Sequence, residues 1–168
     1  MNWKKEIDEM TQRRKLALGQ GGDQAVAKHH AKGRLTIRER IDKLIDQNTF
    51  EEIGPIAGAA NYDENGNLES FDPANFVLGF GKVSGRRIVV GGEDFTMRGG
   101  SPSPAGLRKS VYAEEIAIQY KLPLVRLHEG SGGSVGGTSG KGVSLPGPVN
   151  APVSYTHLRA HETPEHRV

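Results

Sequence analysis

A short apolar segment, residues 124–128, runs directly into a glycine-rich segment, and this junction limits the possible folds more than any other part of the chain. Seven of the thirteen residues from Gly130 to Gly142 are glycine. Glycine at this density lets the backbone adopt positive φ angles and lets a ligand approach the main chain without a Cβ in the way. Because open α/β folds bind ligands at the C-terminal ends of their strands, the junction predicts a binding turn at the edge of a sheet.

The amides of such a turn can bind an anion, either a phosphate or an oxyanion that forms during a reaction. The phosphate motifs are incomplete. Val135 stands where a Walker motif ending at residues 140–142 needs its first glycine, and Gly142 replaces the final Ser or Thr. Val135 also occupies the last glycine position of a dinucleotide fingerprint that begins at Gly130. The pattern therefore favours an oxyanion site, with a flexible surface loop as the alternative.

Composition excludes several classes of function. Charged residues make up 25% of the 168 residues and the formal net charge is +2, so the chain has no strongly basic character that would indicate nucleic acid binding. The absence of cysteine excludes a disulfide framework, a thiolate metal site and a cysteine nucleophile. No apolar run approaches the roughly 20 residues that a bilayer requires, and the N-terminus is charged. We expect a cytoplasmic protein without a membrane partner.

Three helices are predicted in the N-terminal part of the chain. Residues 2–18 carry a thin apolar stripe, and a second helix is expected over 23–32 with Asp23 as its N-cap. The third helix has the best-defined start, because Thr36 and Glu39 have capping-box spacing, and its apolar period continues to Asn48.

The middle of the chain carries strand signals. Residues 50–53 predict a short strand, whereas residues 54–68 are rich in Gly, Ala, Asn and Asp and predict a loop. Alternating bulky and small residues over 75–90 predict an antiparallel hairpin that turns at Ser84 and Gly85. The glycines of this hairpin leave room for something to lie close across it.

A second glycine turn, residues 96–101, precedes a helix that starts at Ser103 as N-cap, with Pro104 in the first turn, and stops at Pro123. Apolar residues on two faces predict that this helix is covered on two sides. Leu107, Val111, Ile118 and Leu122 form one face, and Ala105, Tyr112 and Ile116 the other.

Several neighbouring polar pairs invite a chemical interpretation. Adjacent residues on a helix project about 100° apart and adjacent residues on a strand point to opposite faces, so neither arrangement makes a metal site or an acid/base pair. We expect structural roles and no metal for His29 with His30, Glu93 with Asp94, and His128 with Glu129.

Four segments together resemble the N-terminal half of the carboxyltransferase (beta) subunit of biotin-dependent acyl-CoA carboxylases. They are residues 33–45, 91–96, 99–101 and 131–133, in the family's order. The resemblance implies an α/β chain with the crotonase-like ββα spiral fold, here truncated and preceded by a helical segment. It also implies transfer of a carboxyl group from carboxybiotin to the α-carbon of an acyl-CoA, with the decarboxylated biotin as proton acceptor.

The resemblance also suggests site residues. The amides of Gly132, Gly133 and Ser134 are the implied oxyanion hole for the enolate, a role that backbone N–H groups can fill without a catalytic side chain. Arg98, Gly99, Gly100 and Ser101 are the implied acyl-CoA-binding turn, with a surface ion pair as the alternative for Arg98. Residues 134–142 depart from the family's pattern, so the acyl preference is not carried over.

The implied partners are a biotin carboxyl carrier, which holds the biotin on a separate protein, a biotin carboxylase subunit, and further copies of the subunit in a hexamer. Three alternatives stay open. A biotin-dependent decarboxylase would run the reaction backwards, and a Gly-rich acyl-CoA-binding module would not catalyse it. A CoA-thioester hydratase or isomerase would need a pair of glutamates, and only Glu129 lies near the turn.

The last residues change in character. Residues 152–168 can be back-translated as a sequencing-library adapter read in frame, so we interpret them as a non-native tail, and the i, i+4 pair His157 and His161 as no zinc site. The expected division is a helical segment at 1–48, a partial carboxyltransferase N-terminal domain at 49–151, and the tail. Such a fragment is expected to be inactive alone.

Overall fold

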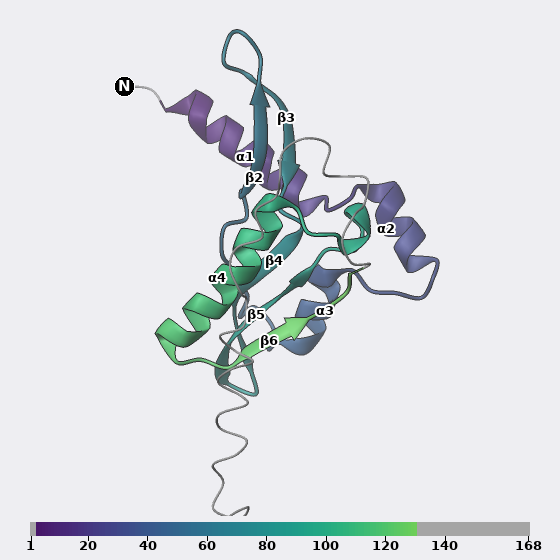
Figure 1. Cartoon of the computed structure of the whole chain (residues 1–168), viewed down its shortest axis with the longest axis vertical. Helices are drawn as coiled ribbons and strands as arrows, with labels where there is room; N and C mark the ends of the chain where they lie inside the picture. Colours follow the sequence, from purple (N-terminus) through teal and green to yellow (C-terminus); the bar gives the residue numbers. More distant parts are fainter. Residues whose placement is uncertain (1–2, 131–168) are drawn as a thin grey trace, which may run out of the picture. The chain divides into compact units, whose positions relative to one another are not determined.

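Residues 3–130 are described by a computed structural model, whose centre is a four-stranded sheet with one helix on each face (Figure 1). The strand order is β1-β4-β5-β6, with β6 parallel to β5 and the other neighbours antiparallel. The predicted hairpin is confirmed and turns at Ser84 and Gly85, which have φ angles of 51° and 77°. The strands are β1 (Glu51–Glu52), β4 (Phe76–Val83), β5 (Arg86–Glu93) and β6 (Leu124–Leu127).

The three N-terminal helices are confirmed as α1 (Lys4–Leu18), α2 (Asp23–His30) and α3 (Ile37–Leu44). The capping box at the start of α3 is formed in both directions between Thr36 and Glu39. Asp23 is the first helical residue of α2 and not its N-cap, which is Gly22, so that prediction was wrong. Helix α3 also ends earlier than Asn48, because the backbone N–H of Asp46 donates to Lys82 O on the sheet instead of continuing the helix.

The hydrophobic core lies in two layers, one on each face of the sheet. Helix α3 packs on one face and α4 (Pro104–Tyr120) on the other. Each of these faces is built from alternate residues of β4 and β5, as the two-residue period of a strand requires. The α3 layer contains Ile37, Ile41, Ile45, Val77, Ile88 and Val90, and the α4 layer contains Phe76, Leu78, Val89, Ala113, Ile116 and Ala117.

Helix α4 starts as predicted, with the Ser103 hydroxyl accepting from Gly106 N and Pro104 in the first turn. It ends at Tyr120, where Lys121 adopts a left-handed conformation. The prediction that this helix is covered on two sides was wrong, since Tyr112 and Ile118 are 45% and 51% exposed. The buried face of the helix includes several small residues, which are Gly106, Ser110, Ala113 and Ala117.

The predicted loop over residues 54–68 was also wrong, because β2 (Gly58–Tyr62) and β3 (Leu68–Pro73) form a second antiparallel hairpin. Asp63 closes its turn by accepting from the amides of Asn65 and Asn67. Helix α1 lies beside this hairpin (Figure 1), with the Arg13 guanidinium 5.5 Å from the ring centroid of Phe71. A run of small and polar residues can thus form strands when a neighbouring helix covers them.

Two glycines of β4 leave space on one face of the β4–β5 hairpin, and side chains of a neighbouring segment occupy it. A Cβ at Gly79 would lie 2.5 Å from the ring of Phe50, and one at Gly81 would lie 2.9 Å from Ile45. The space that the sequence predicted is therefore filled by the segment that links α3 to β1. Among residues 3–130, no helix has both the length and the apolar character needed to span a bilayer.

Candidate functional site

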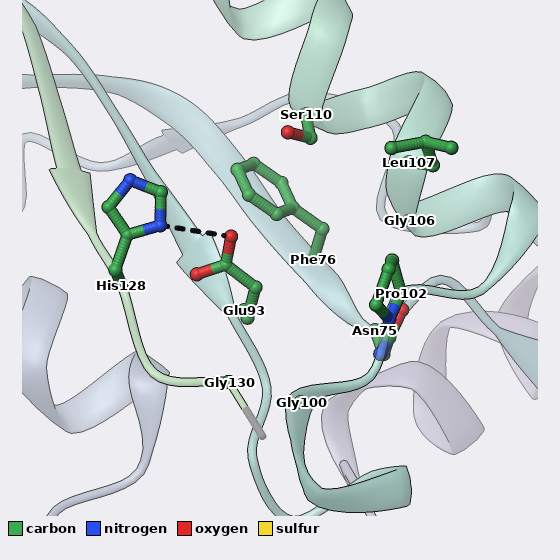
Figure 2. A pocket seen from close by; sticks show the side chains of 10 residues that line it. All are labelled: Asn75, Phe76, Glu93, Gly100, Pro102, Gly106, Leu107, Ser110, His128 and Gly130. Carbon is green, nitrogen blue, oxygen red and sulfur yellow. Dashed lines mark ion pairs between the residues drawn. The ribbon is translucent and has the colours of Figure 1, made fainter. Parts of the chain in front are cut away.

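A cavity of about 340 Å³ opens at the edge of the sheet where β5 and β6 end and α4 begins (Figure 2). Its apolar wall comes from β4 and from the start of α4, and its polar wall from the ends of β5 and β6. Two glycines, Gly100 and Gly130, line it where the two predicted glycine turns lie. The remaining lining residues are Asn75, Phe76, Glu93, Pro102, Gly106, Leu107, Ser110 and His128.

The glycine turn at residues 96–101 and the residues that follow β6 meet at this cavity. The turn at residues 96–101 contains a short 3-10 segment, Arg98–Gly100, in which three successive residues have positive φ angles. A Cβ at Gly100 would lie 2.2 Å from Glu129 O and 2.9 Å from Gly130 Cα. Only glycine at position 100 allows the backbone of this turn to approach the backbone of Glu129 and Gly130 so closely.

Asn75 holds the turn at residues 96–101 against the sheet, a role that was not predicted from the sequence. Its side chain is buried, donates to Ser101 O at 2.6 Å and accepts from Ser103 N at 2.9 Å. These two bonds fix the backbone on both sides of Pro102, just before α4 begins. A single asparagine beside a strand is also typical of an ordinary turn, so the residue type alone carried no signal for this role.

Arg126 organises the polar wall of the cavity. Its guanidinium donates to Ser110 Oγ at 2.8 Å and to Glu114 Oε1 at 3.1 Å, and lies 5.1 Å from the ring centroid of Phe76. It also lies 3.5 Å from Glu93 Oε1. Burial raises the pKa of the Glu114 carboxyl, and the positive charge of Arg126 opposes that rise.

His128 and Glu129, adjacent in sequence, have different partners, as predicted for neighbouring residues at the end of a strand. His128 Nδ1 lies 3.3 Å from Glu93 Oε1 at the cavity (Figure 2). The Glu129 carboxylate instead pairs with residues of the N-terminal helices. The buried Asp94 accepts from the hydroxyl and the amide of Thr96 and so closes a turn, and its burial raises its pKa.

The residues predicted to bind the acyl-CoA are only partly brought together at the cavity. Gly100 lines it, whereas Arg98 is exposed and forms an ion pair with Asp72 on β3. Gly99 lines a neighbouring hollow of about 280 Å³, and the carbonyl of Ser101 accepts from Asn75. The predicted oxyanion-hole residues Gly132, Gly133 and Ser134 lie outside the described residues, as do His157, His161 and the whole of 152–168.

The part of the chain that the structure describes brings no three His, Cys, Asp or Glu side chains together as a metal site. His29 is buried and its Nε2 lies 3.2 Å from Leu35 O, while His30 on the same helix pairs with Glu39. The two histidines thus have separate partners, as their helical spacing predicted.

Comparison with known proteins agrees with this geometry. The model of the carboxyl transferase domain family matches residues 28–145. A probable biotin-dependent acyl-coenzyme A carboxylase beta2 subunit of Mycobacterium tuberculosis is 34% identical over 143 residues, which cover 84% of this chain and 25% of that protein. The propionyl-CoA carboxylase beta chain of Saccharopolyspora erythraea is 34% identical over 132 residues, covering 77% of this chain and 24% of that one.

Solved structures give the same answer for the fold. The hexameric transcarboxylase 12S, with methylmalonyl-coenzyme A and methylmalonic acid bound, has a TM-score of 0.66 at 25% identity over 80% of this chain and 26% of its own. A single-chain, multi-domain long-chain acyl-CoA carboxylase has a TM-score of 0.64 at 30% identity, over 84% of this chain and 15% of its own.

The strand, strand, helix order of β4, β5 and α4, with a glycine turn after β5, is thus the crotonase-like fold of carboxyltransferases. The chain belongs to the carboxyl transferase domain family. It spans about a quarter of the length of the curated relatives that it matches.

Proposed function

We propose that this chain is part of the carboxyltransferase subunit of a biotin-dependent acyl-CoA carboxylase. The subunit transfers a carboxyl group from carboxybiotin to the α-carbon of a short acyl-CoA, of the acetyl or propionyl type. The observation that carries this proposal is the close approach of Gly100 to Glu129 and Gly130, beside a cavity at the ends of β5 and β6. Such a site presents main-chain amides at the place where a thioester can bind.

The reaction requires a stabilised negative charge. Loss of the α-proton moves charge onto the thioester oxygen, and a preorganised backbone N–H contributes about 3 kcal/mol to stabilising such an oxyanion. We assign this role to the amides of Gly132, Gly133 and Ser134, which follow Gly130 in the chain. The apolar residues Phe76 and Leu107 offer a surface for the acyl group.

Biotin, when present on its carrier, brings the carboxyl group and accepts the proton that leaves the α-carbon. The cavity suits a site whose base comes from outside the chain. Glu93 already faces Arg126 and His128, and it accepts from the backbone N–H of Glu129 at 3.3 Å. Both oxygens of this carboxylate already accept hydrogen bonds, from Arg126 and from the backbone N–H of Glu129, so it is poorly placed to take a proton from a substrate.

We propose a biotin carboxyl carrier and a biotin carboxylase subunit as partners, a hexameric assembly, and a cytoplasmic location. We retain Arg98, Gly99, Gly100 and Ser101 as the acyl-CoA-binding turn, with Gly100 facing the acyl end and Arg98 at the surface. Residues 49–151 are then the carboxyltransferase part, residues 1–48 a helical segment, and residues 152–168 a non-native tail.

A chimera tests the function. Residues 28–145 would replace the matching segment of the S. erythraea propionyl-CoA carboxylase beta chain, and the purified subunit would receive a carrier bearing labelled carboxybiotin. We expect labelled malonyl-CoA or methylmalonyl-CoA from acetyl-CoA or propionyl-CoA. Replacing Gly132 and Gly133 together by Val is expected to abolish the transfer.

Other products would point to other functions. Acyl-CoA binding without transfer favours a non-catalytic binding module, and hydration of crotonyl-CoA favours a hydratase. Transfer only from a malonyl-type thioester to free biotin favours a decarboxylase subunit. Full transfer by the double Val variant would place the oxyanion hole elsewhere.

A further inference from the structure

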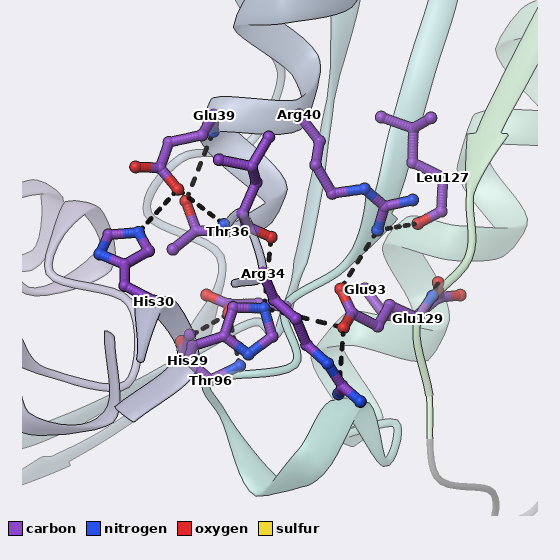
Figure 3. A network of polar contacts seen from close by, with 12 residues as sticks. His29, His30, Arg34, Thr36, Glu39, Arg40, Glu93, Thr96, Leu127 and Glu129 are labelled. Atoms are coloured by element: carbon purple, nitrogen blue, oxygen red, sulfur yellow. Dashed lines mark hydrogen bonds and ion pairs between the residues drawn. The ribbon is translucent and has the colours of Figure 1, made fainter. Parts of the chain in front are cut away.

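The carboxylate of Glu129 points away from the cavity toward the N-terminal helices, where three basic side chains surround it (Figure 3). Arg40 on α3 places Nη1 3.3 Å from Glu129 Oε2. Arg34, between α2 and α3, and His29 on α2 each place a nitrogen 3.7 Å from Oε1. One acidic side chain thus joins the end of β6 to two helices that lie about 90 residues earlier in the chain.

The backbone around Glu129 is held at three further points. Its N–H donates to Glu93 Oε2 at 3.3 Å, and its carbonyl oxygen lies against Gly100. Two residues earlier, Leu127 O accepts from the same Arg40 Nη1 at 3.5 Å (Figure 3). Arg40 therefore contacts both the last residue of β6 and the side chain of Glu129 two residues later, so it fixes the direction in which the chain leaves the strand.

This cluster is not an ordinary surface ion pair. An exposed pair contributes about 0–1 kcal/mol, because solvent screens it. Here the side chains of Glu129 and Arg40 are only 21% and 27% exposed, and the carboxylate lies between two guanidinium groups. Removing its charge would leave the half-buried Arg40 guanidinium without its anion, and the same guanidinium donates to Leu127 O, so the backbone at the end of β6 would lose part of its support.

We propose that Glu129 is a positioning residue for the carboxyl transfer, which holds the backbone of Glu129 and Gly130 in place at the cavity. The proposal rests on the proposed function. Gly130 lines the cavity and its Cα lies beside Gly100, so the path of the backbone at Glu129 sets one side of the cavity. Because an error of about 1 Å in a reacting geometry can cost up to 100-fold in rate, this anchoring matters for turnover.

The pair Arg38–Glu52 provides a matched control. It also joins α3 to the sheet, with N–O distances of 2.9 Å and comparable exposure, but at β1 and away from the cavity. In the chimera described above, Glu129→Gln is expected to lower kcat by at least about tenfold and to change KM by less than about twofold. Glu52→Gln is expected to leave kcat and KM within about twofold of the values for the unsubstituted chimera. Its melting temperature should fall by about as much as that of Glu129→Gln.

A double-mutant cycle separates positioning from stability. If Arg40 and Glu129 act together on the backbone at the cavity, Arg40→Met with Glu129→Gln will lower kcat no further than the more harmful single change. A purely structural pair would couple in the melting temperature and not in kcat. The proposal is overturned if Glu129→Gln and Glu52→Gln lower kcat equally, or if the two losses in kcat follow the losses in melting temperature.

A separate readout covers the case in which the unsubstituted chimera transfers no carboxyl group, which would reject the proposed function itself. Amide hydrogen exchange on the 168-residue chain then tests the anchoring alone. Glu129→Gln should speed exchange at the amides of residues 127–130 relative to Glu52→Gln. Equal exchange in the two variants would show that the carboxylate does not hold this backbone.

Discussion

The carbonyl oxygen of Glu129 lies so close to Gly100 that a Cβ at position 100 would sit 2.2 Å from it. This contact joins the glycine turn that follows β5 to the residues that follow β6, and both segments line the cavity. The distance between these two segments is therefore possible only because residue 100 is glycine.

Gly100→Ala should be more destabilising than a glycine-to-alanine change that introduces only backbone strain. We expect a loss of about 3 kcal/mol in the free energy of unfolding, from the positive φ of 73° together with the overlap with Glu129 O. Gly66→Ala is the matched control, because Gly66 has a φ of 72° and open space around its α-carbon. The control should lose about 1 kcal/mol in urea denaturation. Equal losses would mean that the contact between the two segments contributes nothing.

Asn75→Ala should destabilise the start of α4. The substitution removes the two buried hydrogen bonds that Asn75 makes with Ser101 O and Ser103 N, and we expect a loss of about 2–4 kcal/mol in the free energy of unfolding. Asn61→Ala provides the comparison, since its amide donates to Ser70 Oγ at an exposed site and should lose less than about 0.5 kcal/mol. Chemical denaturation of both variants decides the matter. A small loss for Asn75→Ala would indicate that water replaces its bonds.

Lys109 should make stability depend on pH in the alkaline range. Burial lowers the pKa of its ammonium group to about 8, from 10.5 for the free side chain, although the group donates to Gly54 O at 3.2 Å. Between these two values the unfolded chain binds more protons than the folded chain, so this group's contribution to stability rises as pH increases from 8 to 10.5. Below pH 8 the cost of burying the charge is present in full.

Lys109→Met provides the measurement. The difference in unfolding free energy between the natural chain and this variant should shift by up to about 3 kcal/mol in favour of the natural chain from pH 7.5 to pH 10.5. Other groups that titrate in this range cancel in the comparison. A difference that stays constant with pH would show that Lys109 is hydrated in the folded state.

Two isoleucines of α4 distinguish its faces. Ile116 is buried against the sheet and Ile118 is half exposed, so Ile116→Ala should lose about 2–4 kcal/mol and Ile118→Ala less than about 0.5 kcal/mol. Thermal or urea unfolding of the two variants is sufficient. Similar losses at the two positions would restore the view that the helix is covered on both sides.

Local signals in the sequence were sufficient for much of the fold. Thr36 with Glu39 and Ser103 with Pro104 located two helix starts, and Ser84 with Gly85 located a hairpin turn, because each of these effects acts within a few residues. The β2–β3 hairpin was missed because its strands lack large β-branched residues and depend on α1 for cover. Periodicity also misjudged Ile118, since a helical repeat does not say which face meets the sheet.

The candidate site was predictable only in part. The glycine-rich turns were visible as letters, and the resemblance to carboxyltransferases gave them a role. The contacts of Arg40 with Glu129 and of Asn75 with Ser101 and Ser103 connect residues that are 89, 26 and 28 positions apart. Pairings over such separations follow from the three-dimensional path of the chain and leave no periodic trace in the sequence.

Within residues 3–130, β6 bonds to β5 along one side and runs parallel to it. A parallel strand laid against its other side would reach that place through a crossover, and its carboxyl end would arrive at the same border as Glu93 and His128. Each further crossover and parallel strand would therefore extend the edge of the sheet at which the loops lie. Each added unit would place its loops beside the loops after β5 and β6, next to the layers that α3 and α4 already form on the sheet.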